Sequence, residues 1–207
     1  MRKMKIKHLF LTLVLALSGQ QASADWIVDV YEGLGPYVDI DDAVTAMIAA
    51  GTPTSSGTYD VINFSQGGTF GNYGGDSLFP GSPGDLFGVH VYGTIDLFEG
   101  TNYFGINHDD GMRFDVTCCG TFISSPAPTP PINTFGSVNC SGCGAGFPFM
   151  VDIWLYENFG VASLEFFYSD ADNGIGALVR TVPEPGTLGL LGLGLLGLGL
   201  ARRRKTA

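Results

Sequence analysis

Two adjacent carboxylates, Asp109 and Asp110, are the residues of this chain whose types and spacing best suit a specific chemistry. They stand in the stretch Asn102–Val116 (NYFGINHDDGMRFDV), directly before Gly111. Apolar and polar residues alternate on both sides of the pair, which predicts a β-hairpin with the acids at its tip. Two carboxylates on a rigid turn can bind a hard cation such as calcium and leave part of its shell open to sugar hydroxyls. Asp-Gly is also a common turn dipeptide, so a turn with no ligand is the alternative.

Calcium needs more oxygen ligands than two carboxylates supply, since it takes about 6 to 8. The turn SDADNG, before the last predicted strand, offers further candidates, although an Asx-rich turn without a metal is the alternative there. The predicted calcium site comprises Asp109, Asp110, Asp170, Asp172 and Asn173, and the predicted sugar-binding turn comprises Asp109, Asp110 and Gly111.

The composition favours one all-β domain as the scaffold for this turn. Of the 207 residues, 31 are Gly, 11 are Pro and 14% are charged, which suits short strands and turns better than helices. Alternation is clearest in Asp85–Phe98, and a second hairpin with the turn YENFG is predicted within 149–168. Further strands are expected at 26–31, 59–64 and 174–180. Seven to nine strands in about 157 residues form one β-sandwich or barrel.

One segment, Asp39–Gly51, has the period of a helix instead. Acidic residues cluster in its first turn and Gly51 ends it, as expected for an amphipathic helix. This single short helix should cover an open edge or end of the β-structure with one apolar face: Ile40, Ala43, Val44, Met47 and Ile48.

The charges are unevenly distributed along the chain. Between Asp25 and Thr181 there are 19 acidic residues, the 20 of the whole chain less Glu184, against only Arg113 and Arg180, a formal net charge of −17. Such a domain repels nucleic acid and anionic lipid and favours cations or neutral ligands. Solubility of an exported protein is the alternative reason for this acidity.

The N-terminal segment predicts export. Arg2–Lys7 is basic, Leu9–Leu17 is apolar, and Ala22-Ser23-Ala24 is a small-residue cleavage site. Residues 1–24 therefore form a secretory signal peptide, which signal peptidase would remove before Asp25.

The C-terminal segment combines the motif Val182-Pro183-Glu184-Pro185, an apolar Leu/Gly stretch and four terminal bases. Thr187–Ala201 has only 15 residues, short for a hydrocarbon core of about 30 Å, so it predicts a short transmembrane helix that spans the inner membrane transiently. Its basic tail would stay cytoplasmic.

The three parts in this order, over 182–207, resemble the PEP-CTERM sorting signal of Gram-negative bacteria. The resemblance implies recognition by an exosortase, removal of the helix, and export of the domain to the cell surface or an exopolysaccharide matrix. An ordinary C-terminal anchor with a Pro-rich stalk is the alternative.

Four cysteines, Cys118, Cys119, Cys140 and Cys143, bracket a Pro-rich segment. A zinc site is one use of a CxxC pair, but adjacent cysteines make a poor second limb. Export to an oxidising compartment favours two disulfides, and the three possible connectivities stay open. Bonds between the two pairs would each stabilise the fold by on the order of 3 kcal/mol.

An enzyme is not expected. Gly75-Asp76-Ser77-Leu78 spells the motif of GDSL esterases, but it lacks the strand-to-helix turn and the downstream Asp-x-x-His that such enzymes need. Adjacent acids such as Asp109 and Asp110 also cannot flank a glycosidic bond from two sides.

A helix of the type DDAVTAMIAAG, a strand running into EG, and the stretches FxIxxDDGxxF and IxLYENxGxAxL resemble the PA-fourteen domain. This family is a β-barrel or sandwich module of bacterial toxins, glycosidase inserts and flocculin-type adhesins. The resemblance covers 25–181 and implies carbohydrate binding or a structural role. In adhesin members paired aspartates hold calcium, which would carry over to Asp109 and Asp110.

These observations together predict an exported surface or matrix protein that binds carbohydrate with the help of calcium. A structural or adhesive surface module with no specific ligand is the alternative.

Overall fold

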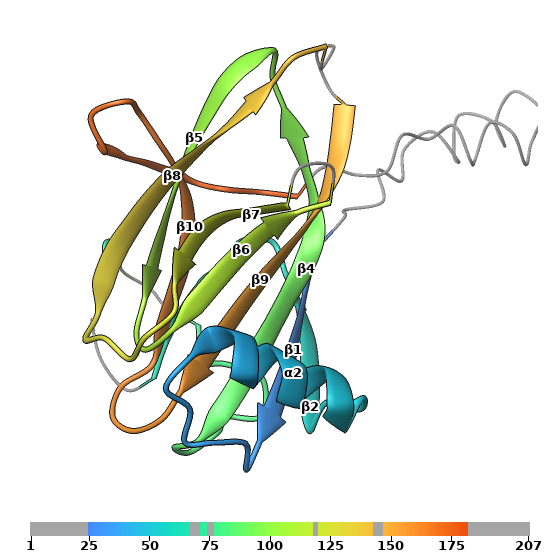
Figure 1. Cartoon of the computed structure of the whole chain (residues 1–207), viewed down its shortest axis with the longest axis vertical. Coiled ribbons are helices and arrows are strands. Elements are labelled where there is room, and N and C mark those ends of the chain that lie inside the picture. The colour runs from blue at the N-terminus through green and yellow to red at the C-terminus, as the bar shows by residue number, and fades with distance from the viewer. Residues whose placement is uncertain (1–24, 67–70, 74–76, 118–119, 143–146, 182–207) are drawn as a thin grey trace, which may run out of the picture. The chain divides into compact units, whose positions relative to one another are not determined.

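The computed structural model describes residues 25–66, 71–73, 77–117, 120–142 and 147–181. These residues form two packed antiparallel β-sheets and one helix (Figure 1), so the predicted all-β class is confirmed. The six-stranded sheet has the order β2–β1–β4–β9–β6–β7: β2 (Ser55–Tyr59), β1 (Trp26–Glu32), β4 (Phe87–Leu97), β9 (Phe147–Glu157), β6 (Met112–Val116) and β7 (Gly120–Ser125). The second sheet has the order β11–β10–β5–β8, with β3 also paired to β10: β11 (Ile175–Leu178), β10 (Ser163–Ser169), β5 (Gly100–His108), β8 (Ile132–Cys140) and β3 (Asn63–Ser65).

Residues 24–182 form one compact unit. The predicted signal peptide, the sorting motif Val182-Pro183-Glu184-Pro185 and the predicted C-terminal helix lie outside the described residues. Within the described ranges, no helix has both the length and the apolar character needed to cross a bilayer.

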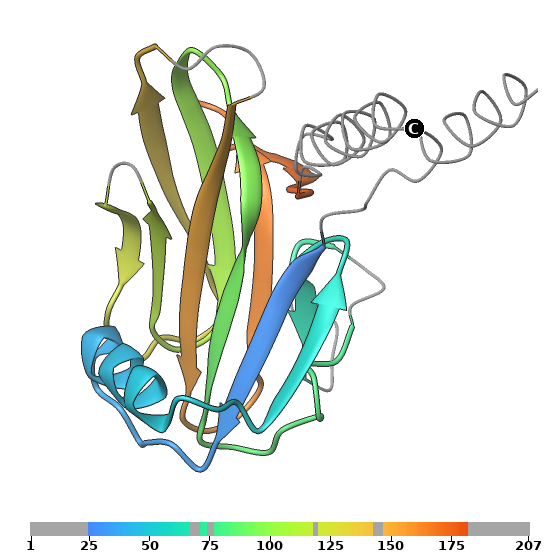
Figure 2. The ribbon, with the colours of Figure 1, turned by 90° about the vertical axis from the view of Figure 1, so that its right-hand side faces the viewer.

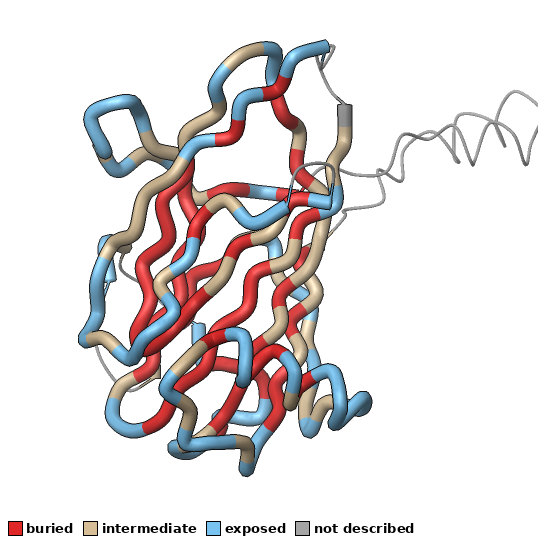
Figure 3. Tube along the Cα trace, viewed as in Figure 1, coloured by how far each residue is buried: buried red, intermediate tan, exposed pale blue. Residues whose placement is uncertain are grey.

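The core lies between the two sheets. It is filled by the apolar side chains of strands in which apolar and polar residues alternate. In β4 the predicted inward-facing residues are all completely buried: Phe87, Val89, Val91, Ile95 and Leu97. Aromatic rings of both sheets meet there, with Phe166 of β10 packed against Phe104 and Phe114. Figure 3 shows this buried layer along the length of the strands.

The helix α2 (Ile40–Ala50) covers the outer face of the six-stranded sheet near the end where β1 and β9 finish (Figures 1 and 2). Asp39 caps it by accepting a hydrogen bond from the N–H of Asp41 (2.8 Å). Gly51, with φ of 71°, ends it. The prediction for Ile48 is wrong: its side chain is 65% exposed, because the helix rests on the sheet only through Ile40, Ala43, Val44 and Met47.

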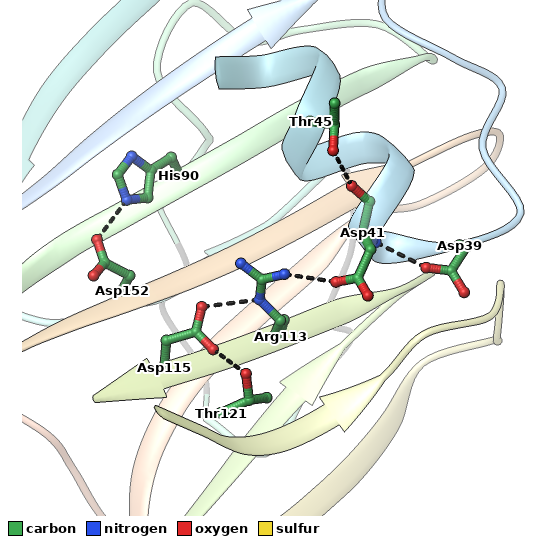
Figure 4. A network of polar contacts seen from close by, with 8 residues as sticks. All are labelled: Asp39, Asp41, Thr45, His90, Arg113, Asp115, Thr121 and Asp152. Atoms are coloured by element: carbon green, nitrogen blue, oxygen red, sulfur yellow. Dashed lines mark hydrogen bonds and ion pairs between the residues drawn. The ribbon is translucent and has the colours of Figure 1, made fainter. Parts of the chain in front are cut away.

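A network of polar side chains connects α2 to the strands β6 and β7 of the six-stranded sheet (Figure 4). Arg113 of β6 donates to Asp41 of the helix (2.6 Å) and to Asp115 (2.9 Å), and Thr121 of β7 donates to Asp115 (2.6 Å). Nearby, His90 contacts Asp152 at 2.7 Å on the same face of the sheet.

Both predicted hairpins are wrong in their pairing, although their strands exist. β5 pairs with β8 and β10, whereas β6 pairs with β7 and β9, so the Asp109–Gly111 turn passes from one sheet to the other. The YENFG turn likewise connects β9 in the first sheet to β10 in the second. Alternation shows that a strand is half-buried but not which strand it pairs with. In a sandwich, two consecutive strands can pair with each other or can belong to different sheets.

Three strands, β2, β7 and β8, were absent from the prediction. The strand expected at 59–64 is wrong, because Tyr59 ends β2 and, of the remaining residues, only Asn63 and Phe64 belong to a strand, the short β3. β7 and β8 flank the Pro-rich segment 126–131, where Gly and Ser residues obscure the alternation. Cys140 at the end of β8 is disulfide-bonded. The other cysteines, Cys118, Cys119 and Cys143, lie outside the described residues, so their predicted connectivity stays a prediction.

Candidate functional site

The two turns that pass between the sheets lie side by side and form the candidate site. The N–H of Asp109 donates to the carbonyl of Ser163 (3.1 Å), and the N–H of Asn158 donates to Oδ2 of Asp110 (2.6 Å). A third segment joins them, because the N–H of Asp110 donates to the carbonyl of Thr129 in the Pro-rich loop (3.0 Å). Three chain segments that are remote in sequence therefore meet at the acid pair.

A pocket of about 510 Å³ opens at this junction. Its wall is mainly apolar, and its charged groups are the two predicted acids. The side chain of Phe159 is 66% exposed at this place, which leaves an aromatic ring available to a ligand. An apolar wall with a few convergent polar groups is the usual composition of a small-molecule site. The lining residues are Asp109, Asp110, Pro128, Thr129, Pro130, Pro131, Phe159, Gly160 and Val161.

His108 supports the turn from inside and is completely buried. Its Nδ1 lies 2.8 Å from the carbonyl of Asp110, and its Nε2 lies 2.8 Å from the hydroxyl of Thr134. Burial lowers the pKa of His108, which keeps the ring neutral. Nδ1 must then donate to the carbonyl, which only accepts, and Nε2 accepts from Thr134. His108 is thus a support for the turn and not a free ligand.

The turn contains one residue in the left-handed conformation. The left-handed residue is Asp110, with φ of 57°, and not Gly111. Gly111 is required for a different reason: a Cβ there would lie 2.2 Å from Cε1 of Tyr156 and 2.7 Å from the carbonyl of Pro126. The hydroxyl of Tyr156 donates to that same carbonyl (3.1 Å), so the tyrosine cannot move aside freely.

Burial raises the pKa of both acids of the pair. The pKa of Asp109 rises to about 6, because loss of water and the neighbouring Asp110 charge outweigh the hydrogen bond from the Asp110 N–H. The pKa of Asp110 is also raised by burial, against the opposing hydrogen bonds from Asn158 and Thr129. Both carboxylates are therefore held in a place that disfavours their negative charge when no cation is near.

A third acid, Glu157, is more deeply buried than the pair and was not predicted as a site residue. It is 1% exposed, and neither of its carboxylate oxygens has a hydrogen-bond partner. Burial, together with the charges of Asp110, Asp109 and Asp85, raises its pKa to about 8. Asp85 also belongs to this end of the domain, since it accepts from the N–H of Gly160 (3.3 Å).

The predicted further calcium ligands are not brought to this site. Asp170, Asp172 and Asn173 follow the far end of β10, whereas Ser163 at its start contacts Asp109. Six residues of strand separate the two ends, which corresponds to about 20 Å. Oδ1 of Asp170 accepts from the N–H groups of Asp172 (2.9 Å) and Gly174 (2.7 Å), the Asx turn that was the alternative. In the described part of the chain, no three His, Cys, Asp or Glu side chains are grouped so that they could hold a metal ion.

Sequence reasoning missed Asn158 as well as Glu157. The side chain of Asn158 donates to the carbonyl of Tyr37 (2.8 Å) and accepts from the N–H of Tyr37 (2.8 Å). Asn158 thereby connects the loop before α2 to the acid pair. The YENFG stretch contained both residues, but a hairpin turn would have placed them far from Asp110.

Ser77 of the GDSL-like stretch has an ordinary structural environment. Its N–H donates to the carbonyl of Asn63 (2.9 Å), and its carbonyl accepts from the N–H of Ser65 (3.1 Å). The histidines of the described residues, His90 and His108, contact Asp152 and the Asp110 turn instead. The described residues therefore give no support to a Ser–His pair at this position.

The fold is similar to that of solved carbohydrate-binding domains. A PA14 sugar-binding domain from an RTX adhesin has a TM-score of 0.58 and 20% identity, covering 78% of this chain and 99% of that one. The PA14 domain of the antifreeze protein MpAFP has a TM-score of 0.55 and 17% identity, covering 77% and 91%. The Epithelial Adhesin 9 A domain from Candida glabrata, in complex with Galb1-4GlcNAc, has a TM-score of 0.51 and 12% identity, covering 79% and 92%. The chain thus has a PA14-like fold.

Residues 181–205 match the PEP-CTERM protein-sorting motif. The chain therefore carries the C-terminal sorting signal of an exported protein of the Gram-negative envelope. No curated protein sequence matches this chain.

Proposed function

We propose that this protein is an exported surface or matrix module that binds a carbohydrate in the pocket at Asp109 and Asp110, with a bound calcium ion. The observation that carries the proposal is the pocket itself, with two buried acids beside the exposed ring of Phe159. Sugars are recognised by stacking of their apolar face on an aromatic ring and by polar groups that bind their hydroxyls. The PA14-like fold supports the same class of partner, since similar domains include a sugar-binding domain and an adhesin domain in complex with Galb1-4GlcNAc.

Calcium suits the acid pair because carboxylate oxygens are its preferred ligands and because, among the described residues, no arginine or lysine forms an ion pair with these two acids. Backbone carbonyls and the sugar hydroxyls would have to complete its shell. Among the described residues that line the pocket, Asp109, Asp110 and the carbonyl groups of the 159–161 segment are candidates to contribute. Glycan partners would include exopolysaccharide, and the sorting motif implies processing by an exosortase and transient contact with the inner membrane.

The deciding experiment is a glycan array probed with the full-length chain, once with calcium and once with chelator. Asp110→Asn is the test variant, because it keeps the shape of the side chain and removes one charge of the pair. We expect binding that depends on calcium and that falls at least tenfold in the variant. The same array signal in every condition, or none in any, would leave DDG as a structural turn and favour a module without a specific ligand.

A further inference from the structure

Glu157 lies deeper than the acid pair, at the end of the sandwich core. It is the last residue of β9 and pairs with Phe87 of β4. In the preceding part of β9, alternate residues Ile153 and Leu155 belong to the core between the sheets, and Glu157 continues that face. Its carboxylate therefore enters the interior and not the side of the sheet that α2 covers.

The carboxylate of Glu157 has no counter-charge from the protein. The basic side chains of the described residues all have other partners: Arg113 pairs with Asp41 and Asp115, Arg180 with Asp60 and His90 with Asp152, whereas His108 is neutral and contacts the carbonyl of Asp110 and the hydroxyl of Thr134. The charged groups that act on Glu157 are acids, namely Asp110, Asp109 and Asp85. Each of them repels a negative charge on Glu157.

A buried carboxylate with neither a hydrogen bond nor an opposite charge is costly, and folded proteins seldom contain one without a use. A proton would relieve both the burial and the repulsion by neutralising the group, and a cation would relieve the repulsion while keeping the carboxylate ionised; the basic side chains of the described residues do not supply that cation. Asp109 and Asp110 line an open pocket, through which an ion from solution can reach the pair, while Glu157 lies outside the lining of that pocket. The position of Glu157 therefore points to the same ion that the proposed function places at the pair.

We infer that Glu157 is an inner carboxylate that strengthens the binding of a divalent cation at Asp109 and Asp110, so that three acids and not two set the affinity of the pocket. The inference rests on the proposed function. Glu157 acts on the ion through its negative charge and not as a ligand, since the three acids are not grouped closely enough to hold a metal ion together. In an interior of low dielectric such a charge acts over several ångströms. With a pKa raised to about 8, Glu157 is largely protonated at neutral pH when no cation is near, so binding of the ion would be accompanied by release of a proton.

Glu157→Gln tests the inference, because it removes the charge and preserves the shape. Calcium chloride alone is titrated calorimetrically into the chelator-treated full-length chain. We expect the affinity for calcium to fall about tenfold in the variant. Glu99→Gln is the matched control: it makes the same change of charge in the turn between β4 and β5, where Glu99 accepts from the N–H of Gly142 (2.9 Å). The affinity of the Glu99→Gln variant for calcium should stay within twofold of the wild-type affinity.

Two further measurements keep the outcomes distinct. Without calcium, at pH 8 or above, Glu157→Gln should melt at a higher temperature than the wild type, since the buried negative charge is gone. Glu157→Leu serves if the glutamine variant does not fold. A variant that binds calcium as tightly as the wild type overturns the inference while leaving the proposed function intact. A wild type that binds no calcium, with identical glycan arrays in calcium and in chelator, overturns both.

Discussion

The neighbours of position 111, and not its backbone conformation, require a glycine there. The position has an ordinary φ, yet a methyl group there would overlap with the ring of Tyr156. We expect Gly111→Ala to destabilise the domain by about 1 to 3 kcal/mol, the usual cost of overpacking. The midpoint of denaturant unfolding measures it.

Gly84→Ala is the control for this substitution, because a Cβ at Gly84 meets no atom within 4 Å and its φ is not in the left-handed region. Its unfolding midpoint should be unchanged or slightly higher. If both variants unfold alike, the contact with Tyr156 does not restrict residue 111.

The acids of the site predict an unusual dependence of stability on pH. The pKa values of Glu157 and Asp109, about 8 and about 6, lie above their ordinary values near 4.5 and 3.8. The folded state therefore holds protons more tightly than the unfolded chain, and protonation favours folding. In chelator, the stability of the domain should be highest near pH 4 to 5 and should fall as the pH rises to about 8.

Thermal melting at a series of pH values, in chelator, measures this trend. Each unit of raised pKa corresponds to about 1.4 kcal/mol, so the total loss should not exceed several kcal/mol. Glu157→Gln should remove most of the decline between pH 6 and 8. A wild-type stability that rises with pH over this range would contradict the assignment of Glu157 as a buried, unpaired acid.

At the scale of elements, the sequence predicted what each strand buries but not what it pairs with. The face of β4 and the caps of α2 follow from local periodicity and from Asp39 and Gly51, which are short-range signals. Pairing depends on the partner strand, and the Asp-Gly turn did not reveal that β5 and β6 enter different sheets. The acid pair was therefore found from sequence, whereas Glu157 and Asn158 became site residues only when the two turns were seen together.

Asn158 joins the loop before α2 to the turn that follows β9. Its side-chain amide makes two hydrogen bonds with the backbone of Tyr37, and both are partly buried. We expect Asn158→Ala to lower the free energy of unfolding by about 2 to 3 kcal/mol, because two backbone groups lose their partners. Chemical denaturation in chelator measures the change without any contribution from a bound ion.

Asn102→Ala is a matched control, since the amide of Asn102 also bonds to a loop, at the N–H and carbonyl of Phe98 (2.9 and 2.8 Å). Those two bonds are exposed, so water can replace them, and the partly buried bonds of the same amide to the carbonyls of Gly100 (3.2 Å) and Val138 (3.5 Å) are long. The loss should therefore stay below that of Asn158→Ala, at about 1 kcal/mol. Equal losses in the two variants would argue against a special role of Asn158 in joining α2 to the site.

In the domain as a whole, the first and last described residues lie close together and away from the pocket. Nε1 of Trp26 donates to the carbonyl of Val179 (3.2 Å), so the first and last strands meet there. Trp26 also packs beside Gly93, which is six residues along β4 from Phe87, the partner of Glu157. This separation corresponds to about 20 Å of strand. The described chain therefore begins and ends at a distance from the residues that line the pocket.

We therefore expect processing to leave both the stability and the binding of the domain unchanged. The core and the pocket described here use residues 25–181, and Val179 and Thr181 are already buried within that range. The melting temperatures of the full-length chain and of protein released from the surface should agree within about 2 °C, and their glycan-array signals should match. Trp26→Phe provides the control, since it removes the donor to Val179 and should lower the free energy of unfolding by about 1 kcal/mol in both forms. A released form that melts much lower, or that loses glycan binding, would show that the removed segments contribute contacts to the domain.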